Sequence, residues 1–255
     1  MFLEPNRTPY DVRFRLFGIP IRAHPFYWLI SVLLALDVFE HDGIVLGLIL
    51  VAVVFISIVV HEMGHALWYR YFGTYSTIVL YGLGGLNIPD EPLPQRRQRI
   101  GAALAGPAAG FLLMGLVWVS NQYYRWSAAS PPYTTATYEW LIYINLIWGI
   151  FNLLPIWPLD GGRVCQEICA HYRRFDGLAL TLKISIGLAI VYILYALAVL
   201  SGRVPQLHAI AEWIPGTVLG IIIMGLIAVS NYQLLQQLRQ GPRFVYRDDD
   251  RPPWR

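Results

Sequence analysis

The chain has 255 residues and a formal net charge of +3. Hydrophobic residues make up 56% of it and charged residues only 14%. Soluble domains contain about 25% charged residues, so this composition argues against a water-soluble fold. The length admits one domain or two.

Six apolar stretches approach or reach the roughly 18 residues that a bilayer span needs. In chain order they cover about 25–39, 43–69, 100–120, 138–159, 183–200 and 217–235. No cleavable signal peptide is expected, because some two dozen residues with four arginines among them precede the first stretch, and no small-residue cleavage site follows it. We therefore expect one transmembrane domain over 1–240, followed by a charged, proline-rich tail over 241–255 that is typical of flexible segments.

The placement of positive charge predicts the orientation of these spans. With a cytoplasmic N-terminus, all 19 Lys and Arg residues except Arg125 and Arg203 face the cytoplasm, as the positive-inside rule requires. Six spans then return the C-terminus to the cytoplasm. The flanking arginines can meet anionic lipid, so the positive charge does not call for nucleic acid, and the arrangement fits a prokaryotic inner membrane.

The second stretch contains the segment "HEMGH", residues 61–65. In a helix His61 and His65 lie one turn apart and project from one face. Two imidazoles so spaced can bind one metal ion, with Glu62 beside them as a general base. A carboxylate in the hydrocarbon region costs about 2.5–3.5 kcal/mol, so its presence there points to function. A metal site is favoured over a helix whose histidines are satisfied by their neighbours.

A hydrolytic zinc site needs a third protein ligand and an open position for water. Asp160 is the best-placed candidate, because it closes the fourth span at a depth similar to that of His61. It lies in "NLLPIWPLDGGR", residues 152–163, where two prolines would break a helix. Non-helical backbone at that depth is tolerated around protein or a water-filled cavity. The alternative is that Asp-Gly-Gly is simply a helix-ending turn.

The segment "TYSTIVLYGLGGLNI", residues 74–88, predicts a β-hairpin. It is rich in β-branched and aromatic residues, has a glycine-rich turn and is stopped by Pro89. A free edge there could pair with the backbone of an extended substrate, although an ordinary cytoplasmic surface hairpin is the alternative. The expected substrate-binding residues are Tyr81, Gly82, Leu83, Gly84, Gly85 and Leu86. The predicted fold is an all-α polytopic membrane protein of about six transmembrane helices with this small membrane-associated hairpin.

Two further patterns are interpreted as packing. Gly106 and Gly110 form a small-xxx-small pair, which is typical of closely packed membrane helices. Cys165 and Cys169 are spaced one helical turn apart on the expected cytoplasmic side, where thiols stay reduced. We interpret both cysteines as small packing residues.

Taken in order, these motifs resemble the site-2 proteases, a family of intramembrane zinc metalloproteases. The resemblance covers about 43–165 and includes "GLGGL" (82–86) and "AGPAAG" (105–110). It implies that His61, His65 and Asp160 bind one Zn2+ per chain, that Glu62 is the catalytic base, and that Asn152 helps to stabilise the reacting carbonyl oxygen. Family members often carry an asparagine where this chain has Gly110, so no catalytic role is assigned there.

The resemblance implies an intramembrane zinc metalloendopeptidase that hydrolyses peptide bonds within or next to transmembrane segments, in regulated intramembrane proteolysis. The implied substrates are membrane-anchored proteins such as anti-sigma factors, or signal-peptide remnants, and the implied form is a compact one without a PDZ or CBS domain. The alternatives are a catalytically inactive client-binding membrane protein and a metal-dependent transporter. An inactive relative would be expected to lose a motif residue, and a transporter would show interrupted spans in two matching halves.

Overall fold

The computed structural model describes residues 5–82, 84–124, 131–173, 176–202 and 217–240. These residues form two compact units. The first contains Phe2–Leu93 and Leu104–Ile150, and the second contains Pro94–Ala103 and Phe151–Arg255. The predicted tail 241–255, Arg125 and Arg203 lie outside the described residues.

The first unit is built around one long helix. The helices that precede α4 are α1 (Pro25–Leu34), α2 (Leu36–His41) and α3 (Ile44–Tyr71). The first predicted span is therefore two short helices, broken at Ala35. With 28 residues, α3 is about 42 Å long at 1.5 Å per residue. That length exceeds the roughly 30 Å hydrocarbon core of a bilayer.

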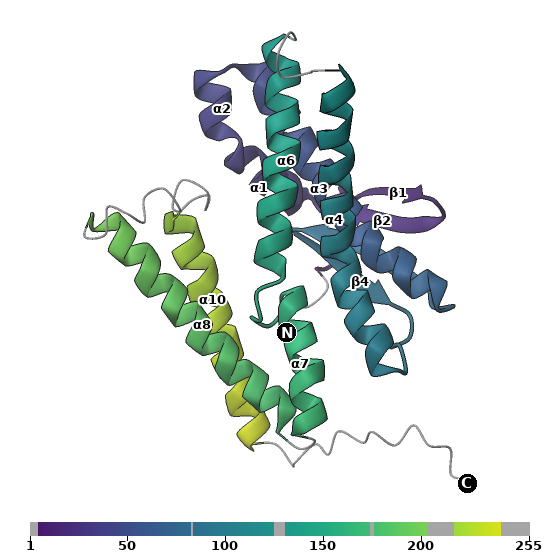
Figure 1. Ribbon diagram of the computed structural model, residues 1–255, viewed down its shortest axis with the longest axis vertical. Coiled ribbons are helices and arrows are strands. Elements are labelled where there is room, and N and C mark those ends of the chain that lie inside the picture. The colour runs from purple at the N-terminus through teal and green to yellow at the C-terminus, as the bar shows by residue number, and fades with distance from the viewer. Residues whose placement is uncertain (1–4, 83, 125–130, 174–175, 203–216, 241–255) are drawn as a thin grey trace. The chain divides into compact units, whose positions relative to one another are not determined.

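Two helices, α4 (Arg96–Tyr124) and α6 (Pro132–Asn152), pass from one unit into the other. The second unit continues with α7 (Asp160–Tyr172), α8 (Gly177–Leu200) and α10 (Thr217–Gln240). The predicted stretch 138–159 is not one helix, because α6 ends at Asn152 and an irregular segment containing Pro155 and Pro158 follows. Figure 1 shows this sequence of helices, with α8 and α10 side by side.

Four helices within the described residues are long and apolar enough to cross a membrane. They are Ile44–Tyr71, Arg96–Tyr124, Gly177–Leu200 and Gly220–Gln240. Only 22% to 33% of the residues in their apolar windows are buried inside the protein. Aliphatic surface on this scale has to be covered by lipid, so the chain is an integral membrane protein. The expected count of six spans is not confirmed, because Pro25–Leu34 is shorter and α6 does not meet the same criterion.

A four-stranded sheet accompanies the helices, in the order β1–β2–β3–β4. Its strands are β1 (Val12–Leu16), β2 (Ile19–Ala23), β3 (Ser76–Tyr81) and β4 (Gly84–Pro89). The predicted hairpin is present as the antiparallel pair β3–β4, in which Tyr81 faces Gly84 across a two-residue loop. The all-α expectation was wrong about the N-terminal hairpin β1–β2, whose arginines were predicted only as charges that flank a span.

One face of the sheet packs on α3. Strands β2 and β3 are parallel, and helices α1 to α3 form the crossover that a parallel pair requires. Buried side chains of both strands, such as Ile21 and Leu80, form one core cluster with Ile58, Val59 and Met63 of α3. The sheet is thereby fixed against the turn of α3 that carries the HEMGH segment.

Candidate metal centre

The three motif side chains lie together on α3. His61, Glu62 and His65 each offer one ligand atom, and these atoms all lie within 4.8 Å of one another. All three are buried, with 3%, 6% and 3% of their surface exposed. In the part of the chain that the structure describes, no other trio of His, Cys, Asp or Glu forms such a cluster. The helical spacing thus brings the side chains together as predicted.

The geometry of the two imidazoles fits a zinc ion. Their Nε2 atoms are 3.2 Å apart, and the rings meet nearly edge to face with centroids 4.9 Å apart. Two ligand atoms held at 2.0–2.1 Å by a tetrahedral zinc ion lie about 3.4 Å apart. Neutral imidazole is also a preferred ligand of zinc, so both the spacing and the chemistry suit this metal.

One glycine on α3 and one on α4 let these two helices pack closely beside the centre. A Cβ atom added to Gly106 would collide with the His65 imidazole, and one added to Gly64 would lie 2.8 Å from the Cβ of Ala109. Both collisions are within the first unit. The expectation of close packing at Gly106 is confirmed, and the packing surface includes a histidine of the motif.

Strand β4 lies directly against Glu62. A Cβ atom added to Gly85 would lie 2.5 Å from Glu62 Cδ and 2.6 Å from its Oε1. The Asn87 side chain donates a hydrogen bond to the backbone carbonyl of Glu62 at 3.3 Å. The glycine-rich part of the hairpin therefore sets the space available to the carboxylate.

A polar contact in the apolar interior ties α6 to α3. The Asn145 side chain donates hydrogen bonds to Ser57 Oγ at 2.9 Å and to the Leu141 carbonyl at 2.8 Å. Ser57 lies one turn before His61, so the bond fixes α6 close to the motif. Asn145 is not among the residues predicted from the sequence. Its signal was an asparagine inside an apolar helix, where side-chain hydrogen bonds between helices are expected.

Asn152 and Asp160 belong to the second unit. Asn152 is the last residue of α6 and Asp160 the first of α7, and both are buried. The Asp-Gly-Gly segment therefore begins a helix and does not end one. A carboxylate in the first turn is also favoured by the helix dipole. The ligand role of Asp160 and the oxyanion role of Asn152 stay predictions.

The loop between α6 and α7 is held from two sides within the second unit. A Cβ on Gly161 would lie 2.5 Å from the Leu154 carbonyl oxygen, and one on Gly162 would lie 2.5 Å from the Trp157 nitrogen. The two glycines are needed because the loop backbone packs directly on the start of α7. From α8 and α10, Ser185 Oγ accepts from Trp157 N–H, and the Asn231 side chain donates to the Trp157 carbonyl, both at 2.8 Å.

Comparisons with known proteins show what the chain is similar to. The model of peptidase family M50 matches residues 122–195, a range that includes Asn152 and Asp160. A zinc metalloprotease of Methanocaldococcus jannaschii is 29% identical over 194 residues, which is 74% of this chain and 54% of that protein. The chain is thus similar over residues 122–195 to peptidase family M50.

Two bacterial proteins are also similar to this chain. A putative zinc metalloprotease of Synechocystis is 34% identical over 60% of this chain and 42% of its own length. Stage IV sporulation protein FB of Bacillus subtilis is 29% identical over 57% of this chain and 46% of its own length. The chain thus spans about half the length of the curated relatives that it matches.

A solved structure shows the same fold. The site-2 protease from Methanocaldococcus jannaschii superposes with a TM-score of 0.59 at 24% identity, covering 88% of this chain and 94% of that one. The likeness therefore extends over most of both chains.

The described residues that are expected to bind substrate lie at the end of β3, in the turn and in the first half of β4. Gly82 adopts a left-handed backbone with φ +57, which glycine adopts without strain. Tyr81 is exposed, Gly84 lies against Trp148, and Leu86 pairs with Val79 of β3. Leu83 lies outside the described residues. Their substrate-binding role in this site-2 protease relative stays a prediction.

The two cysteines of α7 fit the interpretation as packing residues. Their sulfur atoms are 3.9 Å apart. Burial, and then the neighbouring Cys169, raise the pKa of the Cys165 thiol to about 11. A thiol with so high a pKa is protonated near neutral pH, and the thiolate is the nucleophile and the metal ligand.

Proposed function

We propose that the chain is a zinc metalloendopeptidase that hydrolyses peptide bonds within or next to transmembrane segments. The observation that carries the proposal is the buried His61–Glu62–His65 cluster, which lies on a membrane-length apolar helix. Two imidazoles and a carboxylate are costly in such a helix unless they serve a function. The names of the zinc metalloprotease relatives support the same metal and the same reaction.

The residues assigned to the metal are His61, His65 and Asp160, which would hold one zinc ion per chain. The first two are supported by their spacing. Asp160 is supported by its buried place at the start of α7 and by the family match over that segment. When bound, zinc polarises the scissile carbonyl and lowers the pKa of a coordinated water to about 7.

Glu62 is the proposed general base. Its carboxylate would take the proton of the attacking water and later deliver it to the leaving amine. Gly85 leaves only limited space beside the carboxylate, which favours one orientation. Asn152 is proposed to donate a hydrogen bond to the carbonyl oxygen as it gains negative charge.

The substrate is proposed to bind as an extended strand. Peptide bonds in a helix are already hydrogen-bonded, so a transmembrane substrate has to unwind before it is cut. Strand β4 stands at one edge of the sheet, and an edge strand can pair with another backbone. Because β4 also contacts Glu62, a strand paired there would run close to the proposed base.

The membrane location, the extent of the domain and the substrates are proposed from the charge pattern and from the resemblance to the family. We infer an inner-membrane protein with both termini in the cytoplasm, since almost all arginines then lie on that side. Residues 1–240 would act as one metalloprotease domain with its catalytic core over about 43–165. Membrane-anchored regulators such as anti-sigma factors, and signal-peptide remnants, are the proposed substrates.

The test is cleavage of a single-span reporter by the purified full chain in detergent, compared with Glu62→Gln. Glutamine has nearly the same size but cannot accept the proton, so we expect cleavage to fall by at least about 100-fold while zinc content stays the same. Equal turnover by the two proteins would remove Glu62 from the mechanism. Zinc binding without any cleavage by the wild type, across several reporters, would favour a client-binding protein.

A further inference from the structure

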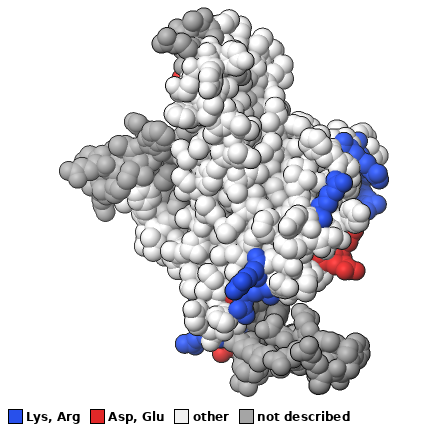
Figure 2. All heavy atoms as spheres, turned by 45° about the vertical axis from the view of Figure 1, so that its right-hand side comes forward, with Lys and Arg blue, Asp and Glu red and all other residues white. Residues whose placement is uncertain are grey.

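The N-terminal hairpin concentrates arginine on one face. Its register pairs Arg13 with Arg22 and Arg15 with Pro20. Because side chains alternate across a strand, these arginines point away from the face where Phe14 and Ile21 join the core cluster. Figure 1 shows β1 and β2 projecting away from the helices, and Figure 2 shows Lys and Arg side chains gathered at the upper right of the molecule.

The arginines surround a shallow cavity of about 410 Å³. Its lining comprises Arg7, Arg13, Phe14, Arg15, Pro20, Ile21, Arg22 and Thr77. Among these described lining residues there are four guanidinium groups and no carboxylate. A concavity lined by one sign of charge concentrates ions of the opposite sign, so this cavity favours an anion.

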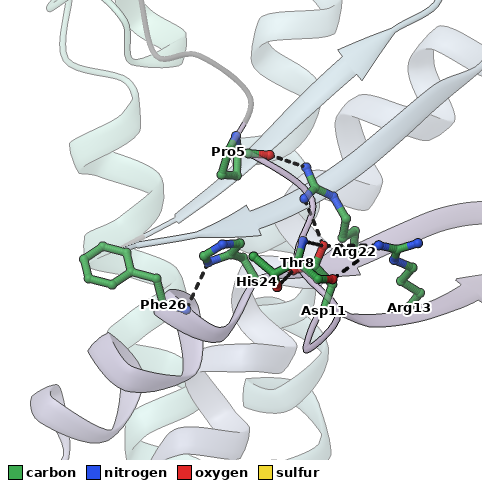
Figure 3. A network of polar contacts seen from close by, with 7 residues as sticks. All are labelled: Pro5, Thr8, Asp11, Arg13, Arg22, His24 and Phe26. Atoms are coloured by element: carbon green, nitrogen blue, oxygen red, sulfur yellow. Dashed lines mark hydrogen bonds and ion pairs between the residues drawn. The ribbon is translucent and has the colours of Figure 1, made fainter.

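One carboxylate beside the cavity is already engaged. Asp11 binds Arg22 at 3.1 Å, and it accepts hydrogen bonds from Thr8 N at 3.1 Å and Thr8 Oγ at 2.6 Å (Figure 3). Burial raises the pKa of the Asp11 carboxyl, but the bonds from Thr8 and Arg22 outweigh it and hold the pKa well below its usual range. Asp11 thus stays charged and balances Arg22.

The remaining arginines keep their charge available to a ligand. Arg13 reaches Asp11 only at 3.5 Å, and 56% of its side chain is exposed. Arg7 and Arg15 are exposed as well. The cavity therefore carries an excess of positive charge after the pairing of Asp11 with Arg22.

An exposed apolar rim borders the same arginines. Tyr10 is 79% exposed and Phe17 73%, and Val12 and Leu16 are exposed too. Phe17 adopts φ +49 in the two-residue turn, an uncommon conformation for a bulky residue. Its carbonyl accepts a hydrogen bond from Arg70 Nη1 at 2.6 Å. The hairpin is thus built to present a phenyl ring to its surroundings.

The hairpin is joined directly to apolar helices. Strand β2 ends at Ala23 and the apolar helix α1 begins at Pro25, where His24 Nδ1 accepts from Phe26 N–H (Figure 3). Arg70, which holds the turn, is in the last turn of α3. Aromatic rings beside arginines at the end of a span are typical of the lipid headgroup layer.

We propose that this arginine cavity binds the phosphate of an anionic phospholipid headgroup, with the Phe17 ring in the interfacial layer beside it. A guanidinium group can donate two parallel hydrogen bonds to two oxygens of one phosphate. A soluble phosphate would explain the arginines but not the exposed apolar rim. The proposal does not depend on the proteolytic activity.

The test measures lipid binding by the detergent-solubilised full chain with native mass spectrometry. Phosphatidylglycerol, phosphatidylcholine and inorganic phosphate are titrated separately. We expect saturable binding of phosphatidylglycerol, with little binding of the other two at the same concentrations. Arg13→Gln with Arg15→Gln should weaken it about 30-fold, since each arginine near an anionic surface contributes about fivefold.

The matched control removes two exposed arginines elsewhere, Arg173→Gln with Arg239→Gln, and should leave the affinity within about twofold of the wild type. If the double variant of the hairpin is unstable, Arg15→Gln alone should still cost about fivefold. An equal loss in the control pair would overturn the proposal, because general charge would explain it. So would equal binding of phosphatidylcholine, or tighter binding of inorganic phosphate than of the lipid.

Discussion

Replacing Gly85 with alanine tests whether the hairpin positions the proposed base. The added Cβ would lie 2.5 Å from Glu62 Cδ and 2.6 Å from Oε1, whereas ordinary contacts between such atoms begin at about 3.5 Å. Either the strand or the carboxylate has to move by about 1 Å. Displacements of that size cost about 100-fold in rate when a catalytic group has to be aligned. We therefore expect Gly85→Ala to lower kcat by about two orders of magnitude.

The adjacent residue supplies the control. A Cβ on Gly84 would meet Trp148 at 3.4 Å, close to ordinary contact, so Gly84→Ala should stay within about threefold of the wild type. Both variants are assayed on the same single-span reporter, with zinc content measured in parallel. Gly85→Ala should keep its zinc, because the change touches the carboxylate and not the imidazoles. Full activity of Gly85→Ala would refute the role of the hairpin in positioning the Glu62 carboxylate.

Three further changes separate metal binding, loop position and acid sensitivity. Gly106→Ala should lower the zinc content at least about tenfold, because the added Cβ displaces the His65 imidazole. The control is Gly115→Ala on the same helix, whose Cβ meets nothing within 4 Å and which should keep its zinc. Equal zinc content in the two variants would contradict this packing. Asn231→Leu removes the hydrogen-bond donor to the loop between α6 and α7. It should lower the free energy of unfolding by about 1 kcal/mol and speed proteolysis of that loop. An unchanged rate of proteolysis would show that the hydrogen bond is dispensable. Folding lowers the pKa of Asp11. The stability that this carboxylate contributes is therefore fully present when the pH is above the ordinary pKa of 3.8. It is lost as the pH falls toward the pKa of the folded protein. Backbone hydrogen exchange in residues 5–23 should therefore accelerate below about pH 4. In Asp11→Asn the exchange should be fast at every pH, because the bond to Arg22 is weakened. A wild type whose exchange does not accelerate would contradict the pairing of Asp11 with Arg22.

The sequence predicted those parts of the site that are set locally. The i, i+4 spacing of His61 and His65 fixes their common face in any helix, and α3 is helical because the surrounding run is apolar and free of proline. The hairpin over 74–88 followed from β-branched residues and glycines at a turn. The interruption after Asn152 followed from its prolines. In each case neighbouring residues determine the conformation.

Features that depend on distant residues were missed. Strands β1 and β2 show alternation in their sequence, but their arginines were interpreted only as topological charges. Their pairing with β3 is a long-range contact that the pattern alone does not specify. Likewise, Ser185 and Asn231 contact a loop that is far away in the chain. Their signal is a polar side chain in an apolar helix, which predicts a partner but not which one.

Zinc content and the zinc X-ray absorption spectrum of the purified full chain test the central claim most directly. We predict one zinc ion per chain, coordinated by two imidazole nitrogens and a carboxylate oxygen at about 2.0–2.2 Å. His65→Ala and Asp160→Ala should each remove most of it. A full complement of zinc with an unchanged spectrum in Asp160→Ala would contradict Asp160 as a zinc ligand.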